Sequence, residues 1–412
     1  MDPADSDAHR RTLGAVFGAT FFVRFAFGVT LAVFASYILR HSTGLSDGDY
    51  ATVGLVSAMA PVGEFSTVLV SGVIADRVGR FPVLFGGMLG AAGLFALVAG
   101  TRSTLALGSI NFLFGISSGA ILAASLAVVA DRSGTFERGF EMGRFDAMNL
   151  FGWLGGFAFG LAFLGWLRNS ALGYVFLLGA AMLVAGLVVA AFLVRGVPRG
   201  ATAHPDSVRV ILAAAFRRGV LLLTLPWLVI YMLIGYVLVF IGTAASGISF
   251  PLDYIALGIG GGGALLVLSQ PYLGKLADRH GRMRLMTVGT AGFVGVMVCA
   301  SLLLNYGVNY FVIGALALSA LAALAYGPAA LAALTDLSQS MSRATTMAVY
   351  SLTISLGMIL GLVVSTQLIA WLGNVGLFVF FGAVSAALVL LTVARYADVR
   401  RPLPATPTTP AQ

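Results

Sequence analysis

The chain has 412 residues, of which 59% are hydrophobic and only 10% are charged, and its mean hydropathy is +0.98. Soluble domains contain about 25% charged residues, so this composition excludes a soluble globular protein and indicates an integral membrane protein. The formal net charge of +8 raises the question of a nucleic-acid partner, which the positions of the cations answer below.

The apolar runs are continuous and close to, or longer than, the ~20 residues that cross a bilayer as a helix. A β-barrel would instead need alternating segments of about 10 residues. The sequence therefore predicts an all-α membrane protein with twelve spans. In chain order they cover 13 to 37, 50 to 74, 82 to 100, 105 to 130, 144 to 167, 172 to 194, 218 to 243, 253 to 273, 285 to 304, 310 to 335, 345 to 371 and 376 to 395.

The cations are distributed unequally between the two sides of the predicted spans. With both termini in the cytoplasm, twenty Lys and Arg residues lie on that side, and only Arg40, Arg102 and Arg168 lie in the outer loops. The positive-inside rule then sets the orientation of a multi-pass protein of the plasma membrane. The basic charge is thus explained by topology, and no nucleic-acid partner is predicted.

A cytoplasmic segment, 1–12, precedes the first span, which is retained as a helix and carries Arg24. The second span carries Glu64 and leads into a polar stretch from Gly72 to Arg80, interpreted as the connection to the third span. In this stretch Gly79 suits a tight turn, because glycine tolerates positive φ.

Further along, the fifth span has Gly152, Gly156 and Gly160 four residues apart, which predicts a face that packs closely on another helix. Residues 195–217 form a polar linker. Residues 397–412 are rich in proline and threonine and are predicted to be a disordered cytoplasmic tail.

The polar stretch occurs twice, since the residues from Gly274 to Arg282 repeat it 202 positions later. At an offset of 205, Gly152 and Gly156 correspond to Gly357 and Gly361. Corresponding segments keep the same orientation across six spans, so the halves are parallel repeats related by an axis along the membrane normal. The predicted six-helix bundles are 13–194 and 218–396.

These features resemble the major facilitator superfamily of secondary transporters. Its hallmark is a G-x-x-x-D-R-x-G-R/K sequence between the second and third helices, which recurs more weakly between the eighth and ninth. The resemblance covers residues 12 to 396 and implies alternating access by rocking of the two halves, gated by a cytoplasmic network. The residues implied are Gly72, Asp76, Arg77, Gly79, Arg80, Asp131 and Arg138, with Gly274, Asp278, Arg279, Gly281, Arg282, Asp336 and Arg343 in the other half.

Two patterns of the drug–proton antiporters in that superfamily are missing. Asn111 stands near the place where many of them carry an arginine in the fourth helix, and the fifth span has no Gly-Pro signature. The resemblance therefore favours the superfamily over that particular branch.

Arg24 and Glu64 are the ionisable residues placed deepest in the spans. Arg24 lies 11 residues after position 13 and Glu64 lies 10 before position 74, so at about 1.5 Å per residue both lie at a similar depth. We expect them to pair near a central cavity, where Arg24 binds an anionic group or releases Glu64 for protonation. The alternative is a static pair that holds two helices together.

Other polar residues extend this predicted substrate or coupling set. Asp146 and Asn149 share a face of the fifth helix, although a solvated charge at a helix end also explains Asp146. The remaining candidates are Asn111, Tyr231, Tyr236 and Gln270, for each of which packing with a satisfied hydrogen bond is the alternative.

Gly258 to Gly263 formally match G-x-G-x-x-G, but they lie inside an apolar span without the strand and loop that a dinucleotide site needs. No metal-ligand cluster or nucleophile–base arrangement occurs, so no enzyme activity, cofactor or metal is predicted. The prediction is a monomeric secondary transporter of a small solute in the lipid bilayer, with protons as coupling ion. The solute is an organic anion, a metabolite or an exported amphiphile, and the alternative function is a solute sensor with the same fold.

Overall fold

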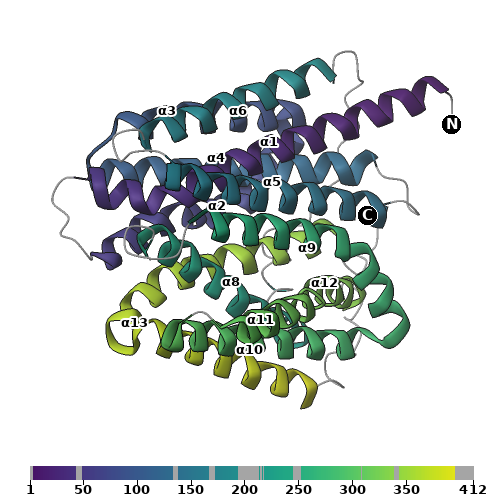
Figure 1. Ribbon diagram of the computed structural model, residues 1–412. Helices are drawn as coiled ribbons and strands as arrows, with labels where there is room; N and C mark the ends of the chain where they lie inside the picture. The colour runs from purple at the N-terminus through teal and green to yellow at the C-terminus, as the bar shows by residue number, and fades with distance from the viewer. Residues whose placement is uncertain are drawn as a thin grey trace. The chain divides into compact units, whose positions relative to one another are not determined.

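The computed structural model describes residues 3–42, 49–132, 138–166, 172–193, 213, 216, 218–244, 252–307, 309–337 and 343–394. Every regular element in these ranges is a helix. The helices are α1 (Pro3–His41), α2 (Tyr50–Val78), α3 (Arg80–Gly100), α4 (Thr104–Arg132), α5 (Arg138–Trp166), α6 (Leu172–Leu193), α8 (Arg218–Ala244), α9 (Leu252–His280), α10 (Arg282–Tyr306), α11 (Tyr310–Ala323), α12 (Tyr326–Leu337) and α13 (Arg343–Ala394) (Figure 1).

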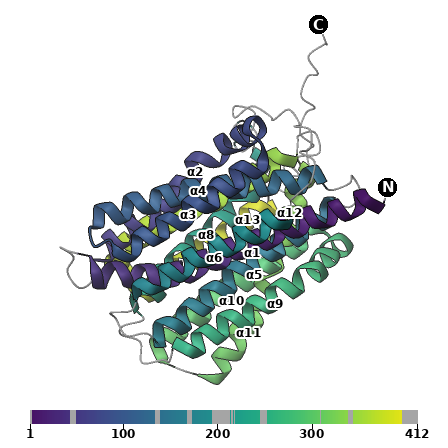
Figure 2. The same ribbon diagram turned by 90° about the horizontal axis from the view of Figure 1, so that it is seen from above.

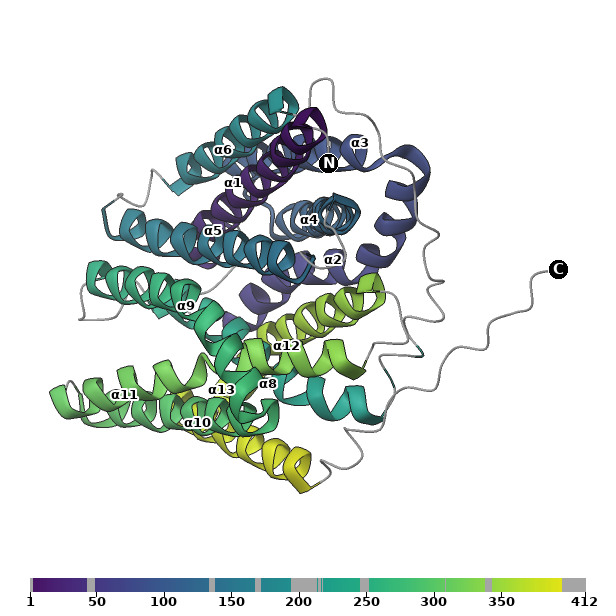
Figure 3. The same ribbon diagram turned by 90° about the vertical axis from the view of Figure 1, so that its right-hand side faces the viewer.

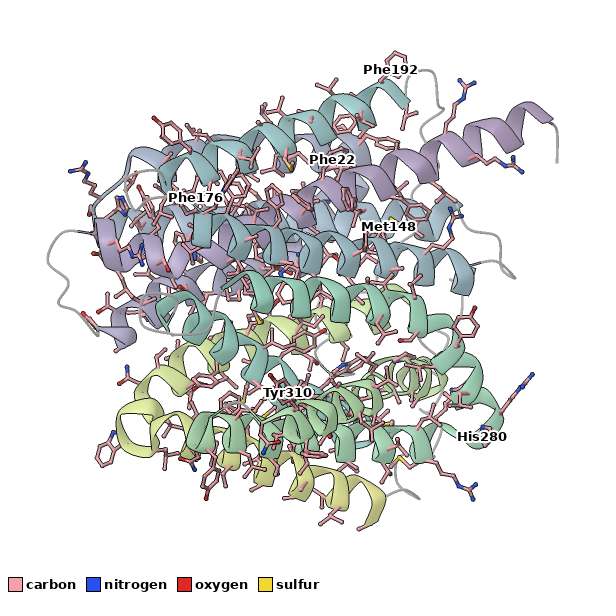
Figure 4. All side chains as sticks on the ribbon, viewed as in Figure 1. Phe22, Met148, Phe176, Phe192, His280 and Tyr310 are labelled. Atoms are coloured by element: carbon pink, nitrogen blue, oxygen red, sulfur yellow. The ribbon has the colours of Figure 1, made fainter. Side chains whose placement is uncertain are left out.

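Ten helical stretches within the described ranges are long and apolar enough to cross a bilayer, which confirms the predicted all-α membrane fold. Large apolar side chains on the helices are also exposed: Leu105 by 82%, Trp166 by 84% and Phe311 by 91%. Phe192, near the end of α6, points away from the helices (Figure 4). Such a surface suits contact with lipid rather than with water.

Within the described residues each of the twelve predicted spans lies on these helices, and the last two share α13, which kinks at Gly373, but the span from 310 to 335 is broken. A turn at Leu324 and Ala325 separates α11 from α12. Pro328 has no N–H to donate to the Leu324 carbonyl, and the N–H of Ala325 bonds to Ala322 three residues back, at 3.1 Å. The helix is therefore interrupted where the sequence analysis expected continuity.

The two copies of the polar stretch form the same kind of break. Each stretch was predicted to be a connection between spans, whereas α2 and α9 continue through almost all of it, and only Gly79 and Gly281 of the two stretches lie outside the helices. Gly79 has a φ of 107° and Gly281 a φ of 92°, conformations that favour glycine. The N–H of each donates to a carbonyl four residues earlier, Ala75 or Ala277, at 3.0 Å. A single glycine thus turns the chain at both places.

The described residues fall into two compact units. The first comprises those within Met1–Pro205 and Gly235–Val267, and the second those within Asp206–Ile234 and Leu268–Gln412. This division passes through α8 and α9. The predicted bundles 13–194 and 218–396 stay a prediction.

In the first unit, α1 packs mainly on α5 and α6, and α2 packs mainly on α4 (Figure 3). The third helix covers α4 and α6 (Figure 2). In the second unit α10 is the most connected helix, since it packs on α11, α12 and α13. These arrangements place α4 beside α2 and also against α1.

Equivalent glycines make equivalent helix contacts in both halves. A Cβ on Gly156 would overlap the carbonyl oxygen of Phe25 in α1, and one on Gly361 would overlap that of Met232 in α8. In both halves, therefore, the fifth helix packs on the first through a glycine, as the spacing predicted. The contacts agree with the parallel repeat.

Candidate functional site

Arg24 on α1 and Glu64 on α2 lie in the middle of their helices and are half-buried. Around Glu64 the backbone of α2 packs closely against α4, because Gly115 and Gly119 of α4 have no Cβ to keep the two helices apart. The Ser118 hydroxyl on the same face of α4 donates to Glu64 Oε2 at 3.2 Å. Glu64 is therefore held against α4 by a neutral donor.

The guanidinium carbon of Arg24 lies 6.0 Å from the centre of the Phe27 ring, one turn further along α1. Phe27 in turn stacks on Phe114 of α4, with ring centres 5.3 Å apart. On the α5 side, Gly152 leaves room for Arg24, since a Cβ on that glycine would lie 3.0 Å from the Arg24 Cβ. The described contacts of the Arg24 side chain are thus an aromatic ring of its own helix and the α5 backbone at Gly152.

The ion pair predicted between Arg24 and Glu64 is not formed in this geometry. In the part of the chain that the structure describes, Arg24 and Glu64 form no ion pair. The similar depth of the two residues in the membrane is not sufficient for pairing. Glu64 turns toward Ser118 on α4, whereas Arg24 lies over the Phe27 ring. Ser118 was not among the predicted site residues, although its spacing of four from Phe114 places both on one face of α4.

Asn111 has a defined structural contact. Its side-chain amide donates to the carbonyl of Val56 at 2.9 Å and to that of Ser57 at 3.2 Å. In a regular helix the Ser57 carbonyl would accept from residue 61, but Pro61 has no N–H. Asn111 therefore supplies the donor that the proline cannot, and its predicted role in substrate binding stays a prediction.

The other candidates occupy varied environments. Asn149 is half-buried, and its Oδ1 has no hydrogen-bond partner among the described residues. Tyr236 is 1% exposed. Tyr231 packs beside Gly357 as Arg24 packs beside Gly152, so the two residues are equivalent in the repeat. The side chains of Asp146 and Gln270 lie outside the described residues.

The structure describes the side chains of only some of the predicted cytoplasmic gating residues. Arg77 and Arg279 are exposed, whereas Arg80 and Arg282, which begin α3 and α10, are half-buried. The network itself stays a prediction, because the side chains that would complete it lie outside the described residues. These are Asp76, Asp131, Arg138, Asp278, Asp336 and Arg343, while Gly72 and Gly274 lie within α2 and α9.

The glycine run matching G-x-G-x-x-G lies inside α9. A Cβ on Gly263 would lie 2.9 Å from the Leu154 Cβ of α5, and one on Gly260 would lie 3.4 Å from Ala158. The run thus serves close helix packing, as the sequence analysis preferred.

Tyr326, the first residue of α12, is a buried polar residue of the second unit. It is 1% exposed, donates to the Leu223 carbonyl at 3.2 Å and meets Trp227 edge to face. We expect Tyr326→Phe to lower the free energy of unfolding by about 1 kcal/mol, because one buried hydrogen bond is lost. Thermal unfolding in detergent measures this, with Tyr310→Phe, 87% exposed, as the matched control that should change little.

A model of the Major Facilitator Superfamily matches residues 16–268 and 254–411, which together cover most of the sequence. The chain belongs to the Major Facilitator Superfamily. No curated protein matches its sequence.

Solved structures show the same fold as this superfamily member. The nucleoside transporter NupG is 14% identical with a TM-score of 0.66, and the match covers 93% of this chain and 99% of NupG. The human organic anion transporter MFSD10 (TETRAN) is 18% identical with a TM-score of 0.66 and coverage of 95% and 100%. A POT family transporter in complex with 5-aminolevulinic acid is 15% identical with a TM-score of 0.72 and coverage of 95% and 97%.

Proposed function

We propose that this superfamily member is a secondary active transporter that moves a small solute by rocker-switch alternating access, with protons as the coupling ion. Its family supports solute transport, and a transporter rather than an enzyme. The similar structures are described as a nucleoside transporter, an organic anion transporter and a transporter bound to 5-aminolevulinic acid. A small polar solute is consistent with all three.

The observation that carries the proposal is the presence of Arg24 and Glu64, half-buried at mid-helix and without an ion pair between them among the described residues. Charged groups at mid-membrane depth are costly and mark solute or proton pathways. Arg24 is suited to an acidic group of the solute. Glu64, whose one hydrogen-bond partner among the described side chains is the Ser118 hydroxyl, is suited to take up and release a proton.

Reconstituted protein tests both parts of the proposal. Proteoliposomes containing the dye pyranine report proton movement when nucleosides, organic acids, amino acids or short peptides are added outside. We expect at least one class to move protons faster than in protein-free liposomes. Glu64→Gln should abolish this proton movement while exchange of the same solute across the membrane continues, because the carboxylate alone carries the proton.

Two other results would point elsewhere. If Glu64→Gln left solute-driven proton movement unchanged, coupling through Glu64 would be wrong. If solutes raised the melting temperature of the purified protein but none crossed the liposome membrane, a sensor with the transporter fold would replace the transporter.

A further inference from the structure

We propose that the solute is amphoteric, with an acidic group that binds Arg24 and a basic group that binds Glu64 at the same time. This inference rests on the proposed transport function and deepens it by naming the class of solute. Three observations carry it: among the described residues neither charge has an opposite partner, both charges lie at one level of the first unit, and an aromatic ring lies beside Arg24.

The first observation concerns charge balance. The described contacts of Arg24 are the Phe27 ring and the α5 backbone near Gly152, and that of Glu64 is the Ser118 hydroxyl. None of these groups carries a compensating charge. A proton neutralises Glu64 but leaves the charge of Arg24, and a simple anion neutralises Arg24 but leaves the charge of Glu64. A solute with both kinds of group neutralises both.

The second observation concerns their placement. Phe27 lies three residues after Arg24 on α1, and Phe114 lies four residues before Ser118 on α4. Successive spans alternate in direction, so α1 and α4 run antiparallel. Starting from the Phe27–Phe114 stack, Arg24 and Ser118 therefore lie about one turn away in the same direction. Because Ser118 binds Glu64, both charges lie at the same level of the first unit.

The third observation concerns the surroundings of the two charges. Among the described residues Arg24 and Glu64 form no ion pair, since they approach no closer than 4.0 Å, so each charge stays separate from the other. Beside Arg24 lies the half-buried ring of Phe27, which stacks on Phe114, and Phe114 is itself buried with Phe95 stacked behind it at 4.5 Å. A solute with an apolar segment next to its acidic group would meet this ring beside Arg24.

A series of ω-aminoalkanoates with three to eight carbons serves as a ruler for the separation of the two charges. The matched controls are the alkanoate and the alkylamine of each length, which carry one charge only. We expect one aminoalkanoate to raise the melting temperature of the purified full-length protein by about 3 °C more than either control. A maximum at one chain length is expected because the two binding groups are fixed on different helices.

Single-charge variants assign each end of the solute. Arg24→Gln should lose the advantage of the aminoalkanoate over the alkylamine, and Glu64→Gln should lose its advantage over the alkanoate. Arg102→Gln, which removes an exposed arginine in the turn before α4, should respond as the wild type does. If the glutamine variants fail to fold, Arg24→Lys and Glu64→Asp keep the charges and should retain a weaker response with a shifted optimum length.

Equal stabilisation by the alkanoate and the aminoalkanoate would overturn the amphoteric solute and leave an anion transporter. Transport of another class in the pyranine assay, with all three series without effect, would likewise overturn it while the transport function stands. If the three series and the pyranine panel both gave no response, the amphoteric solute and the proposed function would fail together.

Discussion

Gly156→Ala is expected to prevent the accumulation of folded protein. The added Cβ overlaps the carbonyl oxygen of Phe25, which belongs to the backbone of α1 and cannot move aside as a side-chain tip can. Separating α1 from α5 would weaken the most extensive helix contact of the first unit. We expect a loss on the order of 3 kcal/mol or more, near the upper end for overpacked positions. Fluorescence-detected size-exclusion chromatography measures the folded fraction.

Gly155→Ala is the matched control, since it makes the same change one residue away on the same helix. Its Cβ meets only the Phe25 ring at 3.9 Å, an ordinary contact, so folding should be retained. Gly361→Ala should repeat the defect in the second unit, because its Cβ overlaps the carbonyl of Met232 in α8. Normal yield and melting temperature for Gly156→Ala would contradict the described contact between α1 and α5.

Asn111→Leu is expected to lower the free energy of unfolding by about 1 to 2 kcal/mol, because the Ser57 carbonyl loses its side-chain donor inside an apolar span. The dependence on Pro61 is the sharper test. In a Pro61→Ala background residue 61 regains its N–H, which can bond to Ser57 and make the Asn111 amide dispensable. Melting temperatures of the four proteins of this double-mutant cycle measure the coupling.

Additive effects of the two substitutions would contradict the explanation. Asn111→Leu would then act through packing, which is independent of the proline. Ser109→Leu serves as a control on the same helix, since Ser109 is exposed and bonds only to Leu105 within α4. That substitution should leave stability nearly unchanged in both backgrounds.

The sequence was sufficient wherever a property depends on local pattern. Apolar length predicted where helices lie, because a bilayer accepts few other backbone structures. The spacing of Gly152, Gly156 and Gly160 predicted the packing face of α5, and Gly79 predicted a turn. The break before α12 was missed although Pro328 was visible, because proline in a membrane helix is often accommodated without interruption.

The direction in which a side chain points around its helix could not be predicted from the sequence. Depth along α1 and α2 predicted that Arg24 and Glu64 lie level, but pairing also requires both helices to turn those faces toward each other. The neighbouring helix α4 sets these directions. Its Ser118 hydroxyl donates to Glu64, and its Phe114 ring stacks on Phe27, over which the Arg24 guanidinium lies. No spacing within α1 or α2 contains that information.

The sequence by itself determined three properties: the membrane class, the positions of the spans and the parallel repeat. They follow from hydrophobic length, cation asymmetry and glycine spacing, which are all properties of the linear sequence. Only the tertiary structure decided which groups meet. It brought the Asn111 side chain to the carbonyls of Val56 and Ser57, more than fifty residues away, and it left Arg24 and Glu64 without an ion pair between them. The physical reason is that contacts between helices depend on their rotation and closeness, which the fold sets as a whole.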